Sequence, residues 1–270
     1  MKQTGKTNKS YCGLITDFGN QDFFSGVLKG VIKQINPHME VIDITNEIPS
    51  YSTIAASFVV EKTYPFFPTG TIFLVVVDPG VGTGRGILLA RHEERYFIGP
   101  DNGVLTPILQ KENTTVSILD KEKYFLIRGN STFEARDKMA PAAAYLGAGI
   151  ALEEIASPYC DFIVDAAYLP TKTQNSISAR VAYIDKFGNI MTNVSEDFLY
   201  TALEEAGAGG FKVEVNGREI EGFFKTYALA GSGPFMLIGS HRNLEIAVNR
   251  GSAASLLQAR IGAEVGIIFY

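Results

Sequence analysis

The chain has 270 residues, of which 46% are hydrophobic and 20% charged, and its formal net charge is −5 at pH 7. This length is enough for one large or two moderate domains. The acidic balance argues against a nucleic-acid partner, because such proteins gather Lys and Arg into a basic face. No apolar run approaches the roughly 18 residues of a membrane span, and residues 1–10 lack the apolar region of a signal peptide. We predict a disordered tail over residues 1–10 and a cytoplasmic protein that binds neither nucleic acid nor membrane.

Neither a metal site nor a disulfide is indicated. The two cysteines, Cys12 and Cys160, are far apart in the chain, so a disulfide framework or a zinc knuckle is not supported. His38, His92 and His241 are isolated, without the spacing of metal ligands, and no GxSxG nucleophile motif is present. We expect no metal, a reducing compartment, and surface or structural roles for the three histidines.

Residues 11–167 are predicted to form an α/β domain. Short apolar runs alternate with longer segments of helical spacing. Strands that alternate with helices imply a mainly parallel sheet flanked by helices. The expected strands are 11–16, 40–44, 70–77, 88–91, 96–98 and 123–127, and the expected helices are 23–35, 53–62 and 141–149.

The composition changes at residues 168–178, where Pro, Thr, Asn and Ser replace the apolar periodicity, and we predict a linker there. Over residues 179–270 the runs are short and β-like, separated by turns such as Asn216-Gly217. This pattern predicts a smaller, antiparallel β-barrel domain.

Polar residues directly after a strand are the first candidates for a site, because open α/β sheets bind ligands at the carboxyl ends of their strands. Asp17 and Asp22 flank a glycine in TDFGNQD. A carboxylate there suits a ribose diol or caps the next helix. Asp78 and Arg85 enclose PGVGTG and form either a structural ion pair or a polarising pair. This loop lacks the GxxxxGK[ST] pattern, so we reject a nucleoside triphosphate site.

Three further segments are rich in hydrogen-bonding groups. The first two are DNG at 101–103 and TFEARD at 132–137, and the Arg136–Asp137 neighbours of the latter are more typical of a surface or structural ion pair than of catalysis. In the second domain, DKFGN at 185–189 joins a carboxylate, an aromatic ring and an amide. That set suits an ammonium group and a stacked base, or it forms a plain hairpin turn.

Seven segments together carry a family resemblance. They are LITDFGNQD, IDITNEIP, VVVDPGVGTGR, GPDNGVL, TFEARDKMAPAAAYL, IDKFGNIMTN and LEIAVNRGSAA. In this order, over nearly the whole chain, they resemble the S-adenosyl-L-methionine (SAM) hydroxide adenosyltransferase family, which is related to the fluorinases and chlorinases. The resemblance implies an N-terminal α/β domain, a C-terminal β-barrel, and a homotrimer with active sites between subunits. It also implies that SAM is the substrate and that no cofactor is needed.

Matched motif by motif, the resemblance assigns binding roles to single residues. Asp17 would hold the ribose hydroxyls, and Tyr64 and Phe133 would line the pocket around the ribose and C5′. The methionine amine and the adenine would contact Asp185, Phe187 and Asn189. The other expected substrate contacts are Asp22, Ala135, Ser240, Ser252 and Ala253.

For catalysis, the resemblance implies a water-activating Asp, Arg and His, which correspond to Asp78, Arg85 and Glu134. The third member differs, because the family's FHGRD is FEARD here, and the family's ITH is ITN at 44–46. Water would attack C5′ in line, and methionine would leave as a thioether. Arg85 would orient the water, and Asp78 would hold Arg85 through a bidentate pair. Glu134 would serve as a base that the adjacent arginine weakens.

Two alternatives follow from Glu134. A carboxylate beside the nucleophile would repel chloride or fluoride, which disfavours a SAM-dependent halogenase. If Glu134 abolishes catalysis, the protein would bind SAM or adenosine as a sensor. The predicted function is therefore hydrolysis of SAM to adenosine and L-methionine, with a non-catalytic or very slow SAM-binding protein as the alternative.

Overall fold

The computed structural model describes residues 10–129 and 131–270, so the tail predicted over residues 1–10 lies, except for Ser10, outside the described residues. The chain divides into two compact units, and the boundary between them in the sequence lies between Asp165 and Ala166. Residues 168–178, predicted as a linker, include β8 (Thr171–Lys172) and the first residues of β9 (Ser176–Ile184). Part of this stretch therefore belongs to the sheet of the second unit.

Within residues 10–129 and 131–165, the strands of the first unit form a seven-stranded sheet in the order β2-β1-β3-β5-β4-β6-β7. The neighbours β2, β1, β3 and β5 are parallel, whereas β4, β6 and β7 join the sheet by antiparallel pairing. The sheet is thus mixed, whereas the sequence predicted a mainly parallel one, and its parallel half carries the strand ends that matter for the site. The strands are β1 (Tyr11–Thr16), β2 (Glu40–Thr45), β3 (Ile72–Val76), β4 (Ile87–His92), β5 (Arg95–Pro100), β6 (Thr115–Leu119) and β7 (Ala156–Pro158).

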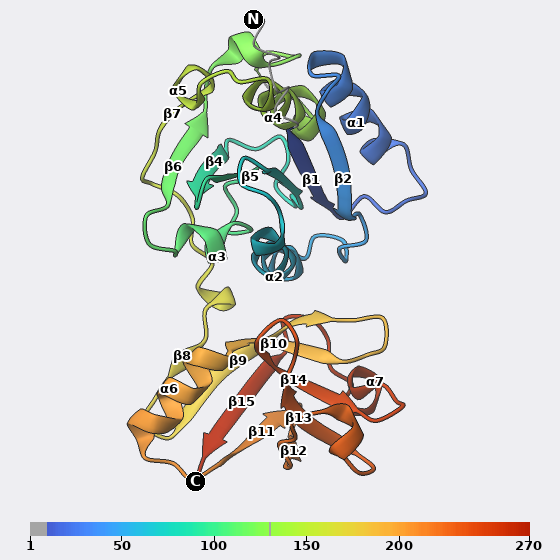
Figure 1. Ribbon diagram of the computed structural model, residues 1–270, viewed down its shortest axis with the longest axis vertical. Coiled ribbons are helices and arrows are strands. Elements are labelled where there is room, and N and C mark those ends of the chain that lie inside the picture. The colour runs from blue at the N-terminus through green and yellow to red at the C-terminus, as the bar shows by residue number, and fades with distance from the viewer. Residues whose placement is uncertain (1–9, 130) are drawn as a thin grey trace, which may run out of the picture. The chain divides into compact units, whose positions relative to one another are not determined.

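Helices cover both faces of this sheet. Figure 1 shows α1 and α4 on one face and α2 and α3 on the other. Every residue of β3 is buried, as expected of a strand covered on both sides. Alanines on α4 let this helix pack closely against α1. The helices are α1 (Phe24–Ile35), α2 (Thr53–Thr63), α3 (Thr106–Leu109), α4 (Ala140–Gly147) and α5 (Leu152–Ile155).

The strand predicted over residues 123–127 is wrong. Glu122–Tyr124 forms a 3-10 turn, η2, and the strand of this region is β6, which lies earlier in the chain. The apolar character of the predicted run has two other sources. Tyr124 and Phe125 pack against the core around α4, whereas Leu126 and Ile127 are exposed.

Residues 166–270, all of which the structure describes, form an eight-stranded antiparallel sheet in the order β12-β11-β15-β9-β10-β14-β13, with β8 paired to β9. A bridge between Phe223 and Met236 brings the β12 edge next to β13, so the sheet is nearly closed and barrel-like. The other strands are β10 (Ile190–Ser195), β11 (Phe211–Val215), β12 (Arg218–Ile220), β13 (Pro234–Ile238), β14 (Asn243–Val248) and β15 (Glu264–Phe269).

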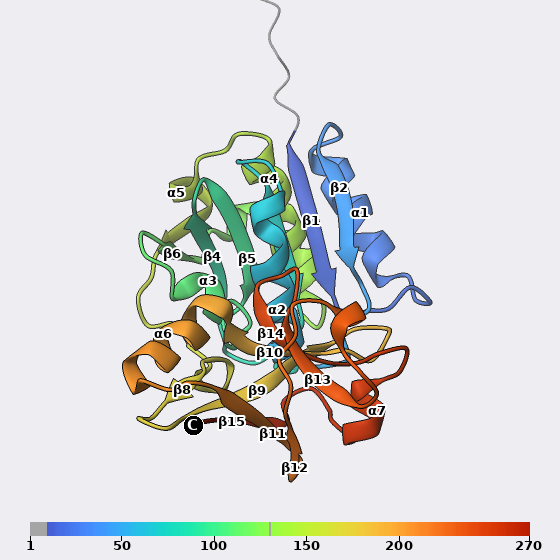
Figure 2. The same ribbon diagram turned by 60° about the horizontal axis from the view of Figure 1, so that its bottom comes forward.

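Two helices accompany the second sheet, α6 (Glu196–Ala206) and α7 (Ala253–Leu257). Figure 2 shows α6 beside β8, where Lys172 pairs with Glu205, and α7 on another side of the unit. The predicted fold class, an α/β unit followed by a smaller antiparallel barrel, is confirmed. None of the helices in the described part of the chain has the length and apolarity that a membrane crossing requires.

Candidate active site

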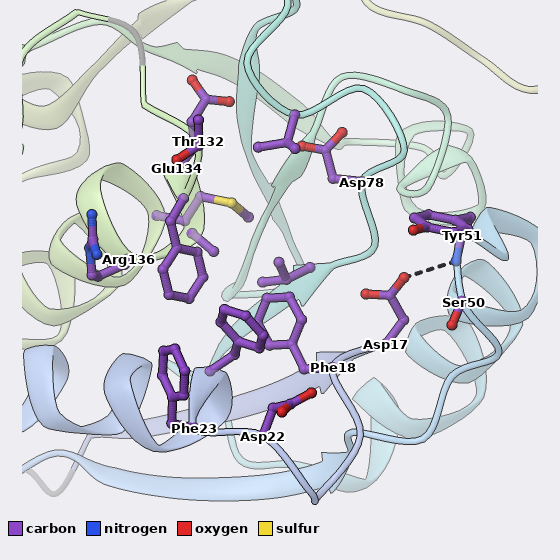
Figure 3. A pocket seen from close by; sticks show the side chains of 16 residues that line it. Asp17, Phe18, Asp22, Phe23, Ser50, Tyr51, Asp78, Thr132, Glu134 and Arg136 are labelled. Atoms are coloured by element: carbon purple, nitrogen blue, oxygen red, sulfur yellow. Dashed lines mark hydrogen bonds between the residues drawn. The ribbon is translucent and has the colours of Figure 1, made fainter.

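A pocket of about 640 Å³ opens in the first unit at the carboxyl ends of β1 and β3. Figure 3 shows Asp17 and Asp78 on one side of it and Glu134 and Arg136 on the other. The segments after β1, after β3 and before α4 build its walls. Its lining includes the carboxylates of Asp17, Asp22, Asp78 and Glu134 and the guanidinium of Arg136. Six predicted site residues therefore line or adjoin one cavity: Asp17, Asp22, Asp78, Phe133, Glu134 and Ala135.

Asp78, Arg85 and Glu134 form one hydrogen-bonded cluster. Arg85 Nε donates to Asp78 Oδ1 at 2.8 Å, and Nη2 donates both to Asp78 Oδ2 and, at 2.8 Å, to Glu134 Oε2. The side chains are only 10%, 9% and 5% exposed in the order Asp78, Arg85 and Glu134. Charged groups this deeply buried need partners, and here two carboxylates share one guanidinium.

The glycine-rich loop after β3 folds so that Arg85 returns to Asp78. Gly80 N–H donates to Asp78 Oδ1 at 3.1 Å, and Thr83 Oγ1 donates to the Gly80 carbonyl at 2.8 Å. Gly82 has φ +80°, a left-handed conformation that favours glycine. The loop is thus a compact turn that joins the two members of an ion pair, and Arg85 Nη1 closes it by donating to the Gly86 carbonyl at 3.0 Å.

Glu134 precedes a π-helical turn, η3 (Ala135–Met139), that leads into α4. Its Oε1 accepts a hydrogen bond from Lys138 Nζ at 2.6 Å, so each of its two oxygens has one cationic partner. π-Helical turns occur mostly as short insertions in α-helices and are frequent at functional sites. The cluster therefore extends from Asp78 through Arg85 and Glu134 to Lys138.

Asp17 lies at the end of β1, across the pocket from Glu134 (Figure 3). Its Oδ2 accepts the backbone N–H of Tyr51 at 2.9 Å. Burial raises the pKa of Asp17, the charge of Asp78 raises it further, and the Tyr51 N–H opposes the shift. Tyr51 has φ +66°, a strained conformation for a residue other than glycine. Such strain is common in the walls of functional sites.

Asn46 stands where the resemblance implies a histidine. It is buried, its Oδ1 accepts from Thr16 Oγ1 at 2.9 Å, and its carbonyl accepts the Gly19 N–H at 2.7 Å. These bonds hold the start of the loop that carries Asp17. Asn46 thus has a structural role in this chain.

An aromatic wall completes the pocket. The rings of Phe18, Phe24 and Phe133 lie 5.4 to 5.8 Å apart, centroid to centroid. Arg136 lies over the Phe133 ring at 5.2 Å, and its Nε and Nη2 donate to Asp137 at 2.7 and 2.8 Å. The expectation of a structural Arg136–Asp137 pair fits this geometry. Phe18 was missed by the sequence reasoning, although it follows Asp17 directly.

In the second unit, Asp185 organises the turn between β9 and β10. Its Oδ1 accepts the backbone N–H groups of Phe187 and Asn189, both at 2.9 Å, and its Oδ2 accepts from Asn189 Nδ2 at 3.0 Å. The hairpin-turn interpretation therefore describes the carboxylate in this structure. Phe187 remains 66% exposed and, with Asn189, lines a pocket of about 410 Å³.

Tyr227 lines the same pocket and was missed by the sequence reasoning. Its hydroxyl donates to Glu245 Oε1 at 2.5 Å, and Glu245 is 1% exposed. Burial raises the pKa of Glu245, the Tyr227 hydroxyl opposes the shift, and the charge of Asp185 adds to it. Alternating polar residues in a strand are ordinary, so nothing local in the sequence marks Glu245 as buried.

Ser252 and Ala253 begin α7. Ser252 caps the helix by accepting the Ser255 N–H at 3.0 Å, and Ala253 is fully buried. The Gly188 carbonyl accepts the Ala254 N–H at 2.9 Å, which ties α7 to the DKFGN turn. Their predicted contacts with substrate remain predictions, as does that of Ser240, an exposed residue in the turn between β13 and β14.

Tyr64 lies apart from the pocket that contains Asp17. It is 5% exposed and lines a different pocket of about 450 Å³, beside His92 and Lys111. The reason is the length of α2, which begins near Tyr51 and rises about 16 Å over its 11 residues before reaching Tyr64. This chain alone does not bring Tyr64 to the pocket of Asp17, and its contact with the ribose stays a prediction.

Within residues 10–129 and 131–270, no three His, Cys, Asp or Glu side chains gather as a metal ion would require. The fold and the site together define an α/β unit with an acidic pocket at its strand ends, followed by a barrel-like unit with a smaller pocket. This arrangement is the one that the sequence resemblance implies for enzymes that use SAM.

Comparison with known proteins agrees with that class. Residues 12–156 match the family model described as the SAM hydroxide adenosyltransferase N-terminal domain, and residues 179–266 match the C-terminal domain of the same family. The chain therefore belongs to the SAM hydroxide adenosyltransferase family.

Several relatives are similar over nearly their full length. The chain is 32% identical to an (R)-S-adenosyl-L-methionine hydrolase of Thermus thermophilus, covering 94% of this chain and 98% of the relative. It is 30% identical to a protein of the same name from Methanocaldococcus jannaschii, covering 95% of each chain. A fluorinase of Actinopolyspora mzabensis is 26% identical, over 94% of this chain and 95% of the relative. A crystal structure of an uncharacterized conserved protein from Thermotoga maritima, 33% identical, has a TM-score of 0.83 and covers 95% of this chain and 99% of its own.

Proposed function

We propose that this protein hydrolyses SAM to adenosine and L-methionine by attack of water on the ribose C5′. The observation that carries the proposal is a single cavity that joins the Asp78–Arg85–Glu134 cluster to Asp17. The Asp78–Arg85–Glu134 cluster can position a water molecule, and Asp17 can hold a ribose diol. Relatives named as (R)-S-adenosyl-L-methionine hydrolases support the (R) sulfonium epimer as the substrate.

The charge of the pocket suits a sulfonium substrate. Four carboxylates line it, of which Asp78 and Glu134 are balanced by Arg85 and Lys138. The guanidinium of Arg136 pairs with Asp137, so the carboxylates of Asp17 and Asp22 leave the lining net negative. A cleft lined by one sign of charge concentrates ligands of the opposite sign. SAM carries its positive charge on the sulfur next to C5′, so the same field that binds the substrate surrounds the bond to be broken.

Arg85 is the group that positions the water. A guanidinium has five N–H groups, of which four donate to Asp78, Glu134 and the Gly86 carbonyl. Asp78 and Glu134, and not Arg85 itself, line the pocket, so the remaining Nη1 N–H is the donor that we propose for a water held beside these two carboxylates. As the C5′–O bond forms, the C5′–S bond breaks and its electron pair stays on sulfur, so methionine leaves as a neutral thioether. The proton of the water passes to one of the two carboxylates held on Arg85.

The reaction as written needs no external electron carrier, and we propose that the protein works without a cofactor. We further propose, on the resemblance, that the protein acts in the cytoplasm as a homotrimer whose sites combine two subunits. In that assembly the pocket with Phe187, Asn189 and Tyr227 would receive the adenine and methionine ends of SAM.

The test is to incubate the purified protein with each sulfonium epimer of SAM, with and without chloride, and to quantify the products by mass spectrometry. Arg85→Gln is the key variant, and Arg91→Gln is its matched control, because Arg91 is an exposed arginine on β4 that pairs only with Glu94 among its described ion pairs. Equal amounts of adenosine and methionine, lost in Arg85→Gln and kept in Arg91→Gln, are the expected result.

Two other results would replace the proposal. SAM that stabilises the protein against heat but is not consumed would make it a SAM-binding protein. A 5′-halogenated adenosine that forms only with chloride would make it a halogenase. The trimer is tested separately by sedimentation, where a stable monomer at assay concentrations would remove the shared site.

A further inference from the structure

Lys138 contacts Glu134 but does not itself line the substrate pocket. Glu134 lines the pocket, and Lys138 follows it by four residues, with its Nζ 2.6 Å from Glu134 Oε1. The lysine side chain is 15% exposed and its Nζ lies 5.9 Å from the centroid of the Phe125 ring.

The two oxygens of Glu134 have separate tasks. Oε1 accepts from Lys138, whereas Oε2 accepts from Arg85 at 2.8 Å. Arg85 in turn keeps two of its nitrogens on Asp78. The chain Asp78, Arg85, Glu134 and Lys138 alternates in sign and balances two carboxylates with two cations.

Without Lys138 the cluster of Asp78, Arg85 and Glu134 loses its charge balance beside the pocket. Three buried groups would then carry one net negative charge beside the place where an oxygen nucleophile must approach, and such a charge acts strongly at a site with little water. Oε1 would also be free to turn toward Arg85, which would compete with Asp78 for the guanidinium. Both changes oppose the attack of water without touching the parts of the pocket that hold SAM.

We propose that Lys138 is a positioning residue for the hydrolysis: it holds Oε1 of Glu134 and neutralises the carboxylate, so that Oε2 and Asp78 together fix Arg85. This inference rests on the proposed function. It makes Glu134 and Lys138 a unit, in which the lysine is needed because residue 134 is charged.

The test measures kcat, KM and the melting temperature for the wild type, Lys138→Met, Lys138→Arg, Glu134→Gln and the double variant Glu134→Gln/Lys138→Met. In the wild-type background we expect Lys138→Met to lower kcat by about 10- to 100-fold and to change KM by less than about 3-fold. Lys138→Arg, which restores the cation, should stay within about 3-fold of the wild type.

The effect of Lys138→Met on kcat in the Glu134→Gln background distinguishes this role from a merely structural one. With Gln at position 134 the lysine has no carboxylate to balance, so removing it should leave kcat within about 3-fold of the Glu134→Gln parent or raise it. Lys123→Met is the matched control, because Lys123 is an exposed lysine of the same unit that stacks only on Tyr124 among its described contacts. Its kcat should equal that of the wild type.

Three results overturn the inference. The first is a Lys138→Met variant with the kcat of the wild type, and the second is an equal loss of kcat on Lys138→Met in both backgrounds. In either case, adenosine formation by the wild type would leave the proposed function intact. If the wild type forms no adenosine at all, the proposed function fails and the inference falls with it. Should Lys138→Met not fold, Lys138→Gln, which keeps a polar end, replaces it in both backgrounds.

Discussion

Asp17 should show opposite effects on activity and stability when it is neutralised as Asp17→Asn. Its Oδ2 accepts the Tyr51 N–H, and an asparagine oxygen can keep that bond. The other oxygen, which faces the pocket (Figure 3), would become an amide that cannot accept from the ribose diol. A hydrogen bond to a charged group contributes about 1.5–3 kcal/mol, so kcat/KM should fall by about 10- to 150-fold.

The stability effect has the other sign. Burial, with a contribution from Asp78, raises the pKa of Asp17 in the folded protein, so the folded state disfavours the anion relative to the unfolded chain. Ionised Asp17 therefore costs stability above its folded pKa, and this cost disappears as the pH falls below its unfolded pKa. Asp17→Asn removes the cost, so the variant should melt at a higher temperature than the wild type near neutral pH.

The assay combines steady-state kinetics with thermal unfolding at neutral and acid pH. Asp22→Asn is the control for stability, because Asp22 lines the same pocket but is exposed, so its neutralisation should leave the melting temperature nearly unchanged. An Asp17→Asn variant that melts lower than the wild type at neutral pH, or that keeps its full kcat/KM, would refute the reasoning.

Three other variants test separate parts of the structure. Arg85→Lys should lower kcat by about 100-fold in product assays, because an ammonium cannot bind two carboxylates in the same plane. Tyr227→Phe removes the hydroxyl that donates to the buried Glu245 carboxylate and should cost about 1–3 kcal/mol of unfolding free energy in denaturant titrations. Because burial raises the pKa of Glu245, that deficit should shrink as the pH falls and the group is protonated. Gly188→Ala should cost about 1–3 kcal/mol, since Gly188 has φ +85° and a Cβ would lie 2.0 Å from Ser252 Oγ.

Periodicity predicted the parts of the fold whose burial is simple. The strand β3 is buried along its whole length, and the alanine-rich α4 is buried on the face that meets α1, so both patterns are strong. The helix α6 was missed although its signals are local: Ser195 caps it and Gly207 ends it in a left-handed conformation. Short strand-like runs on both sides of α6 dominated the interpretation of the second domain.

The candidate site was predictable only in part. Asp17 and Asp78 follow strands that become parallel neighbours, so their meeting at one edge follows from the topology. The contact of Arg85 with Glu134 joins residues 49 positions apart, and spacing cannot supply it. The segment TFEARD at 132–137 was noted for its polar residues, but only the family resemblance gave Glu134 a catalytic role. Tyr64 also rests on the resemblance alone. It follows α2 and lines another pocket of this chain, so its role at the ribose stays a prediction.

The hydrogen bonds of the cluster explain why water, rather than a halide, suits this pocket. Chloride and fluoride can only accept hydrogen bonds, and they need several donors to replace their hydration. Arg85 has four of its N–H groups engaged with Asp78, Glu134 and the Gly86 carbonyl, so it offers the nucleophile one donor. Two carboxylates stand beside that donor and accept hydrogen bonds. Water can accept from Arg85 and donate to a carboxylate at the same time, and the loss of one proton turns it into the attacking oxygen. The substitution of a carboxylate at position 134 therefore strengthens the selection for water, and Lys138 keeps the added charge from repelling the nucleophile.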